Sequence, residues 1–435
     1  MGGPMTAAAA DSHGSPMEAP GTSLRRLLGL WQPRGRPSRT VAAALTMACL
    51  TWLSLTSSLK LLIDPPAELE EVVLCSFIAS ICTGFLIKAA FFIGAGDTLN
   101  RLVQLLSDTT RQHYNGESNQ HTRDNYQRLS RRLYLYMQAS VVPALIGWVF
   151  FPLISHALIN SDEESSEASW QFPVAHWIPA NMQVSPAYEI LYVVQSFCLI
   201  VASQSTNSID LFFIHMMLMV AAELEVLSEN VSAMKKGDGK LVKTENGGCE
   251  QITKEVLCDG DGNFRRKEDF SAQDVTDDHM YVQLVKNVQH HQAVLKAFTL
   301  LQETMDKSIF ILLFVNMADL CSCVFATAIL LQRGGNVAKA LQPLITIPPC
   351  LYETVMYCFF GNIVTDKSED LVNSAYSCGW ADCETRFRRG LVFFVTQAMR
   401  PLEIKVGKMC KLSKQMLLQV LNGSYMLLNL MYSTS

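Results

Sequence analysis

Residues Ile190–Ala222 read ILYVVQSFCLIVASQSTNSIDLFFIHMMLMVAA, and this stretch decides the class of fold. It contains no Lys or Arg, and Asp210 is its only acidic residue. A helix needs ~20 predominantly apolar residues to cross a bilayer, where every backbone N–H and C=O must be paired within the segment. The stretch therefore predicts a membrane-spanning helix.

Apolar runs of similar length recur on both sides of this segment. The chain has 435 residues, of which 49% are hydrophobic and 17% are charged, whereas a soluble globular protein carries about 25% charged residues. We therefore expect an all-α, polytopic membrane protein rather than a soluble one. The further predicted spans are Val41–Leu59, Val72–Ala95, Leu133–Ile159, Ser308–Leu331 and Ala340–Val364.

The end of the chain departs from this pattern. The apolar stretch that begins at Gly390 is only ~10 residues long, which is too short to span a bilayer. A basic segment, Arg400–Lys414, follows it, and Gln415–Tyr432 is then long enough to cross once. The pattern predicts a broken seventh element, in which a short cytoplasmic helix (7a) precedes a spanning helix (7b).

Lys and Arg are concentrated in alternate connections, and these residues favour the cytoplasmic side. Five arginines lie within residues 1–40, so the N-terminus is predicted to be cytoplasmic. The connection Asp64–Glu71 is acidic, Leu133–Met234 contains no Lys or Arg, and Lys235–Lys296 is Lys-rich. Seven crossings from a cytoplasmic start place Ser435 outside the cell, which is opposite to the orientation of a G-protein-coupled receptor.

Two segments are predicted to lie outside the helix bundle. Residues 1–40 form a cytoplasmic N-terminal segment before a seven-helix domain of residues 41–435, and they lack the short apolar core of a cleaved signal peptide. Residues 235–279 are rich in Gly, Asp, Glu and Lys and poor in aromatic residues. Because such a composition cannot bury a core, we expect a disordered cytoplasmic loop there.

No group of side chains indicates catalysis, a cofactor or a metal ion, so we do not expect an enzyme. His290 and His291 are adjacent, and adjacent residues on a helix point ~100° apart, which suits a polar cytoplasmic helix better than a metal site. The 13 cysteines form no Cys-x-x-Cys pair and are expected to be reduced, mostly buried thiols.

Four ionisable side chains fall within predicted spans, where a charge is costly. Lys88 lies late in its span and is expected to extend to the cytoplasmic surface. Asp210, Asp319 and Glu353 must each meet a donor, water or a neighbouring subunit. A structural hydrogen bond and a role in ion conduction both remain open for these three carboxylates.

The outer halves of four predicted spans carry aromatic and aliphatic side chains and few charges. Such walls suit a small, largely apolar ligand, with Ser80, Ser196 or Tyr192 to orient it. Ordinary helix packing would produce the same pattern, so both interpretations stay open. The candidate ligand-binding residues are Phe77, Ile81, Gly147, Phe151, Tyr192, Ser196, Leu199, Leu344 and Ile347.

The last predicted span has a polar stripe, formed by Gln415, Gln419, Asn422 and Asn429. A stripe of amides is typical of a helix that faces water, and equally of a seam between helices. The neighbouring face is mostly apolar near its outer end, and an apolar constriction can close a pore by dewetting. One copy cannot enclose a pore, so conduction requires several subunits around one axis.

Short motifs add to these patterns. The second outer connection reads WQFPVAHWIP from Trp170 and SPAYEILYVVQ from Ser185. The C-terminal half has Tyr357-Cys358, Gly361, Ser368, Ala375-Tyr376, Trp380, Arg400-Pro401-Leu402, Gly407-Lys408 and Ser424-Tyr425. Together these motifs resemble the insect odorant receptor family, from about residue 40 to the end of the chain.

The resemblance implies an inverted seven-helix subunit that forms a heterotetramer with an olfactory co-receptor, in the plasma membrane of olfactory neuron dendrites. Small volatile odorants would bind in the outer halves of the second, third, fourth and sixth spans and open a non-selective cation path. The gate would involve Leu428, with Ser424 and Met431 as further pore positions. The polar stripe, about a quarter-turn away, would then contact adjacent subunits, and no nucleic-acid partner is implied.

Two rival classes of receptor remain. A gustatory receptor shares the architecture and the channel mechanism, and only the outer-connection and C-terminal motifs favour the odorant branch. A G-protein-coupled receptor would have a cysteine in the second outer connection and an Asn-Pro-x-x-Tyr motif in its last span. Residues 157–187 contain no Cys and Gln415–Tyr432 contains no Pro, which disfavours that class.

Overall fold

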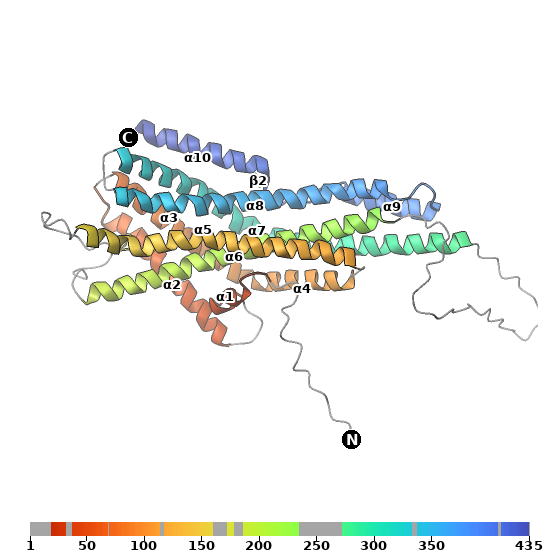
Figure 1. The fold of residues 1–435 in the computed structure, drawn as a ribbon, viewed down its shortest axis with the longest axis horizontal. Coiled ribbons are helices and arrows are strands. Elements are labelled where there is room, and N and C mark those ends of the chain that lie inside the picture. Colours follow the sequence, from red (N-terminus) through yellow and green to blue (C-terminus); the bar gives the residue numbers. More distant parts are fainter. Residues whose placement is uncertain are drawn as a thin grey trace, which may run out of the picture.

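A computed structural model describes residues 19–31, 37–67, 69–113, 117–159, 172–177, 186–234, 272–332, 337–407 and 410–434. This part of the chain forms an elongated bundle of helices, with a single two-stranded hairpin (Figure 1). Its elements in chain order are α1 (Thr22–Leu27), α2 (Pro37–Ile63), α3 (Leu69–Gly94), α4 (Gly96–Gln112), α5 (Glu117–Ile159), α6 (Ala187–Ser232), α7 (Ala272–Gln332), α8 (Val337–Ser377), α9 (Thr385–Ala398), β1 (Lys405–Val406), β2 (Cys410–Lys411) and α10 (Lys414–Thr434).

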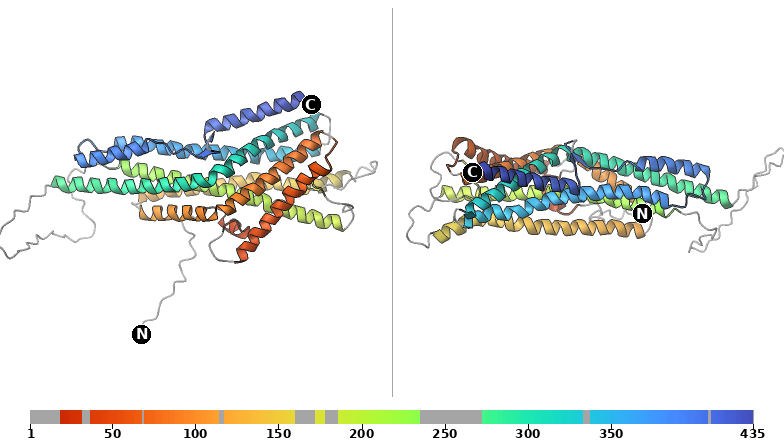
Figure 2. Two further views of the ribbon diagram at one scale, coloured as in Figure 1. Left: turned by 180° about the vertical axis from the view of Figure 1, so that it is seen from behind. Right: turned by 90° about the horizontal axis from the view of Figure 1, so that it is seen from above.

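The apolar segments of the bundle gather at the end where the C-terminus lies (Figures 1 and 2). Within the described residues, α2, α3, α5, α6, α7 and α8 are long and apolar enough to cross a membrane. Helix α10 runs beside them after the break that was expected in the seventh element. The prediction of an all-α, polytopic membrane fold with a broken seventh element is confirmed.

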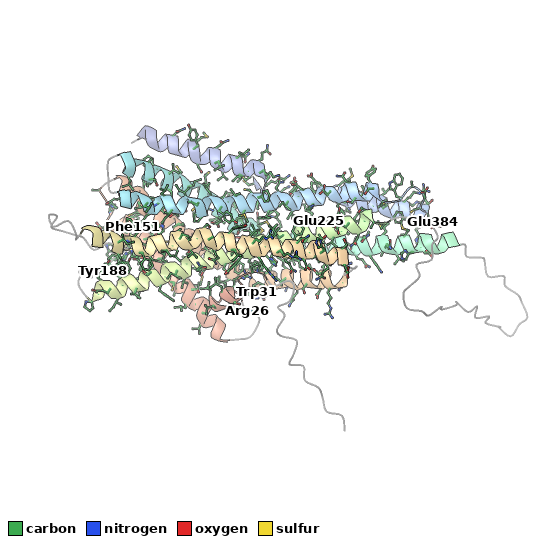
Figure 3. The ribbon with its side chains drawn as sticks, viewed as in Figure 1. Arg26, Trp31, Phe151, Tyr188, Glu225 and Glu384 are labelled. Atoms are coloured by element: carbon green, nitrogen blue, oxygen red, sulfur yellow. The ribbon has the colours of Figure 1, made fainter. Side chains whose placement is uncertain are left out.

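The two ends of the bundle differ in the residues they carry. Phe151 and Tyr188 lie at the end that also holds the C-terminus, whereas Glu225 and Glu384 lie toward the opposite end (Figure 3). Successive long helices alternate in direction between these ends (Figure 1). The apolar end is therefore the membrane-embedded part, and the distribution of Lys and Arg in the sequence assigns the end with Glu225 and Glu384 to the cytoplasm.

Helices α6, α7 and α8 extend well beyond the bilayer into the cytoplasmic part. Helix α6 alone has 46 residues, or ~69 Å at 1.5 Å per residue, against a hydrocarbon core of ~30 Å. Segments that we expected to be connections after the spans are helical instead, because a second apolar core joins them outside the membrane. That core contains Leu227, Val231, Met280, Leu284, Leu371, Ala375, Phe387, Leu391 and Phe394.

Both segments that were expected outside the bundle contribute to it. Arg25, in the N-terminal segment, is buried and donates hydrogen bonds to the carbonyls of Ala19 and Ser208, at 3.1 and 3.3 Å. Residues 1–18 and 32–36 lie outside the described residues. So do residues 235–271 of the expected disordered loop, whereas residues 272–279 are the first turns of α7.

The hairpin between α9 and α10 determines where the last helix begins. Gly407, at its turn, has a φ of 60°, and its Cα lies against the ring of Phe310 in α7. Before the hairpin, the backbone N–H of Leu402 donates to the Ser368 hydroxyl at 3.0 Å, and the Thr365 hydroxyl donates to the Leu402 carbonyl at 3.1 Å. The start of α10 is thus tied to both α7 and α8.

A buried polar cluster joins the helices in the cytoplasmic part. The Glu223 carboxylate accepts hydrogen bonds from Arg123 at 2.8 Å and is 2.9 Å from His290 Nε2. The His113 ring stacks on His290 with 4.4 Å between ring centroids. His290 and His291 are both buried, because α5, α6 and α9 contribute side chains that cover that face of α7.

Substitution of Gly407 tests the hairpin. Gly407→Ala should destabilise the protein by ~1–3 kcal/mol, because a Cβ would both strain a positive φ and overlap the Phe310 ring. Gly96→Ala is the matched control, since a Cβ there meets nothing within 4 Å. Thermal unfolding in detergent measures both variants. An unchanged midpoint for Gly407→Ala would show that the turn does not depend on glycine.

The cytoplasmic histidines predict acid sensitivity. The pKa of both His113 and His291 is lowered from 6.5 to about 4. Burial is the larger cause, and the neighbouring His290 is the second. Between pH 6.5 and 4 the unfolded chain therefore binds protons that the folded chain does not. The contribution of these neutral histidines to the free energy of unfolding is complete above pH 6.5 and is lost as the pH falls toward 4. For the buried His291 the loss is roughly 3 kcal/mol at most.

His291→Phe keeps the ring against Phe394 and cannot titrate. The unfolding midpoint of this variant should therefore fall less between pH 7 and pH 5 than that of the unmodified protein. His279→Phe, at an exposed position of α7, is the control. Equal acid sensitivity in all three proteins would contradict a contribution from His291.

Candidate ligand cavity and the last helix

A cavity of about 140 Å³ lies among α3, α5, α6, α7 and α8 in the membrane-embedded part. An engineered apolar protein cavity of ~150 Å³ binds benzene, so this volume suits a small organic molecule. Most of its wall is apolar and aromatic. The apolar lining residues are Phe77, Ile78, Ile81, Cys82, Phe85, Met137, Val141, Ala144, Leu145, Trp148, Val174, Leu199, Pro349 and Cys350.

The outer end of the cavity has an ordered aromatic wall. The ring centroids of Phe77 and Trp148 are 6.4 Å apart, and the Trp148 indole N–H donates to the Thr346 hydroxyl at 2.8 Å. Val174, from the connection before α6, lines this end, and its carbonyl accepts a hydrogen bond from Gln195 at 2.8 Å. These bonds hold the wall in place without a ligand.

The deep end of the cavity is polar, which the helix directions place toward the cytoplasm. Its lining includes Asn207 and Asp210 of α6, Asn316 of α7 and Glu353 of α8. The Tyr357 hydroxyl donates to Asp210 at 2.6 Å, and the Asn316 amide donates to Glu353 at 3.3 Å. The cavity is therefore amphipathic, with apolar walls and a polar floor.

Lys88 lies beneath this floor and pairs with both of its carboxylates. The Lys88 ammonium contacts Asp210 Oδ1 and is 2.6 Å from Glu353 Oε1. Its side chain is 2% exposed, so the expectation that Lys88 extends to the cytoplasmic surface was wrong. The physical reason is that Asp210 and Glu353 come level with it on two neighbouring helices, and a nearby carboxylate satisfies the ammonium.

Three of the predicted ligand-binding residues line this cavity, namely Phe77, Ile81 and Leu199. The remaining six are placed elsewhere in the outer half of the bundle. Gly147 lies close to Ile345, whereas Phe151 and Ile347 pack among other apolar side chains. The Tyr192 hydroxyl donates to the Val149 carbonyl, and the Ser196 hydroxyl is buried. Leu344 is exposed on the outside of the bundle.

The sequence analysis missed several residues of the cavity. Trp148, Asn207 and Thr346 carried no signal, because an aromatic or small polar residue within a span also serves ordinary packing. Asp210 and Glu353 were noticed as carboxylates within spans, but not as neighbours. Asp319, the third such carboxylate, is 1% exposed on α7 and bonds Ser80 without lining the cavity. The signal in the sequence that could have indicated their pairing was the presence of one cation, Lys88, and three carboxylates within the predicted spans.

Helix α10 lies on the outside of the bundle and packs mainly against α7 (Figure 2). Its contact face is made by Gly423, whose Cα approaches the Met317 side chain, and by Ser424, which donates to the Val420 carbonyl at 3.0 Å and the Met317 carbonyl at 3.4 Å. The polar stripe of Gln415, Gln419, Asn422 and Asn429 is exposed. The side chains of Leu428 and Met431 lie outside the described residues.

A multi-pass helical membrane protein with an internal ligand-sized cavity and an outlying last helix is the class that this structure defines. The family model described as 7tm Odorant receptor matches residues 68–425, and the chain belongs to that family. Membership places it among receptors and not among enzymes, and it favours the odorant branch over the gustatory one.

Individual relatives and solved structures agree with this assignment. Odorant receptor 19a of Drosophila melanogaster is 24% identical over 149 residues, which are 34% of this chain and 38% of that receptor's length. The odorant receptor coreceptor of Anopheles gambiae is 19% identical over 67% of this chain and 70% of its own length. The olfactory receptor OR5 of Machilis hrabei, solved in complex with eugenol, shares the fold, with a TM-score of 0.71 at 12% identity over 95% of this chain and 97% of its own.

The ion pairs of Lys88 predict a charge-dependent stability. Lys88→Met should destabilise the protein by ~3–5 kcal/mol, because it leaves two buried carboxylates without a cation. The triple variant Lys88→Met, Asp210→Asn, Glu353→Gln should recover most of this loss. Lys60→Met is the control, since Lys60 pairs with Asp64 at the surface. Thermal unfolding measures all three, and a triple variant no better than Lys88→Met would contradict the electrostatic explanation.

Proposed function

We propose that this protein is an odorant receptor subunit that binds small, largely apolar volatile molecules in the cavity among α3, α5, α6, α7 and α8. Binding opens a non-selective cation path in a heterotetramer with an olfactory co-receptor, in the plasma membrane of olfactory neuron dendrites. The observation that carries the proposal is the cavity itself, which is lined by aromatic and aliphatic side chains and lies within the membrane-embedded part of a member of the odorant receptor family.

The walls of the cavity support an apolar ligand. Phe77 and Trp148 present ring faces and edges at its outer end, and Ile81 and Leu199 add aliphatic surface. Burial of a ligand in such a site gains roughly 25 cal/mol for each Å² of apolar surface removed from water. Hydrogen bonds within the wall fix its shape before the ligand arrives, which lowers the entropy lost on binding.

The surface of α10 supports an assembly around a pore. Gln415, Gln419 and Asn422 are exposed on α10, which we propose to cross the membrane as the seventh span, and amide groups facing hydrocarbon would be costly. Contact with other subunits or with water satisfies them. We place the gate at Leu428 and Met431, as the family resemblance implies, and the outlying position of α10 leaves it available to neighbouring subunits. Ser424 is bonded to its own subunit's α7.

Filling the cavity tests the function. Leu199→Trp should abolish currents evoked by a panel of volatile ligands in cells that also express the co-receptor, because the indole occupies the ligand's space. Val193→Trp, at an exposed position of the same helix, is the matched control and should respond normally. Surface biotinylation confirms that both variants reach the plasma membrane, and whole-cell recording under blockade of G-protein signalling measures the currents.

Three results would contradict the proposal. Normal currents in Leu199→Trp would remove the ligand from this cavity. Currents that disappear when G-protein signalling is blocked would exclude a directly gated channel. Currents of the same size without the co-receptor would exclude the heteromeric assembly.

A further inference from the structure

The floor of the cavity has two carboxyl groups and one paired cation. Asp210 and Glu353 are paired with one ammonium, that of Lys88, and the three side chains are 2%, 13% and 2% exposed, respectively. The hydroxyl of Tyr357 and the amide of Asn316 donate hydrogen bonds to these carboxylates but carry no charge. Asp210 and Glu353 also hydrogen-bond to each other, so one of the two carries a proton while the cavity is empty. Two ionised carboxylates beside one ammonium would leave an uncompensated charge, which is strongly unfavourable in such a region.

A second polar group faces the same space without a partner. Asn207 precedes Asp210 by three residues on α6, so both side chains lie on one face of the helix. Asn207 is 3% exposed and lines the cavity. Neither its Oδ1 nor its Nδ2 has a hydrogen-bond partner in the described structure. A buried amide without partners costs free energy, and the cavity is where a ligand would supply one.

We propose that the cavity takes a ligand with a protonated amine at one end, seated against Asn207, Asp210 and Glu353, and an aromatic or alkyl body against Phe77 and Trp148. This inference rests on the proposed receptor function and names the class of ligand. An amine that takes up the shared proton becomes an ammonium group, which balances the second carboxylate and supplies up to three N–H donors. Its carbon skeleton fills the apolar part of the same cavity.

Two other occupants of the floor fit these observations less well. The hydroxyl of an alcohol could bond Asn207, but an alcohol is not basic and cannot take up the proton that the two carboxyl groups share. A divalent metal ion requires several oxygen ligands, and no group of three or more His, Cys, Asp or Glu suited to a metal ion occurs within the described residues. The apolar walls above the floor also match an organic cation better than an inorganic one.

A pair of matched ligands tests the amine. The probes are 2-phenylethylamine and 2-phenylethanol, which share one carbon skeleton and differ in the ammonium and hydroxyl groups. Currents from the full receptor with its co-receptor should show a lower half-maximal concentration for the amine. Glu353→Gln removes one of the two carboxyl groups and keeps the side-chain shape. It should raise the half-maximal concentration of the amine by about tenfold or more and leave that of the alcohol nearly unchanged.

Two further variants separate the floor from general effects of charge. Asp319→Asn is the matched control, because Asp319 is a buried carboxylate within a neighbouring span that does not line the cavity. The amine preference should survive in this variant. Asn207→Leu removes the unpartnered amide without changing the charge, and should also weaken the amine response. It replaces Glu353→Gln as the test if that variant does not reach the cell surface.

The possible results distinguish this inference from the proposed function. Currents to the alcohol and other neutral volatiles, with no preference for the amine, would overturn the amine site and leave the receptor function standing. The absence of currents to both the amine and the neutral volatiles would overturn the receptor function. Thermal unfolding of the purified full chain would then test directly whether the amine binds. Stabilisation by the amine in the unmodified chain, lost in Glu353→Gln, would support the site, and equal midpoints with and without the amine would overturn it.

Discussion

The contact of Lys88 with Asp210 and Glu353 joins α3, α6 and α8 in the middle of the bundle. A charge without a partner is expensive in hydrocarbon and in a protein interior, so the three helices are favoured in the one relative depth at which these side chains meet. The same carboxylates form the floor of the cavity. Packing of the membrane-embedded helices and the chemistry available to a ligand therefore depend on one cluster of charges.

The motifs that carry the family resemblance have identifiable mechanical roles. Tyr357 donates to the Asp210 carboxylate and so belongs to the charged cluster. A Cβ at Gly361 would lie 2.6 Å from that of Leu412, so the absence of a side chain lets the end of the hairpin approach α8. Ser368 binds the backbone just before the hairpin. These residues position the start of α10, which lies outside the rest of the bundle.

Much of the fold could be predicted from the amino-acid sequence, whereas the pairing of side chains could not. The apolar spans and the break before the last helix follow from lengths and compositions that lipid imposes. Lys88 was assigned to the surface because a lysine near the end of a span usually extends to it. His290 was assigned to a polar cytoplasmic helix without a partner. In both cases residues distant in sequence, Glu353 and Glu223, provided the partner.

The sequence by itself determined the apolar spans, the break before the last helix and the resemblance to the family, because hydropathy acts residue by residue and short motifs are local. Only the tertiary structure decided that three of the nine suspected ligand-binding residues share one cavity, that its floor is charged, and that α6 to α8 continue as a bundle beyond the membrane. The reason is geometric. Which side chains meet depends on the rotation and depth of each helix relative to its neighbours, and neither is encoded in the composition of a single span.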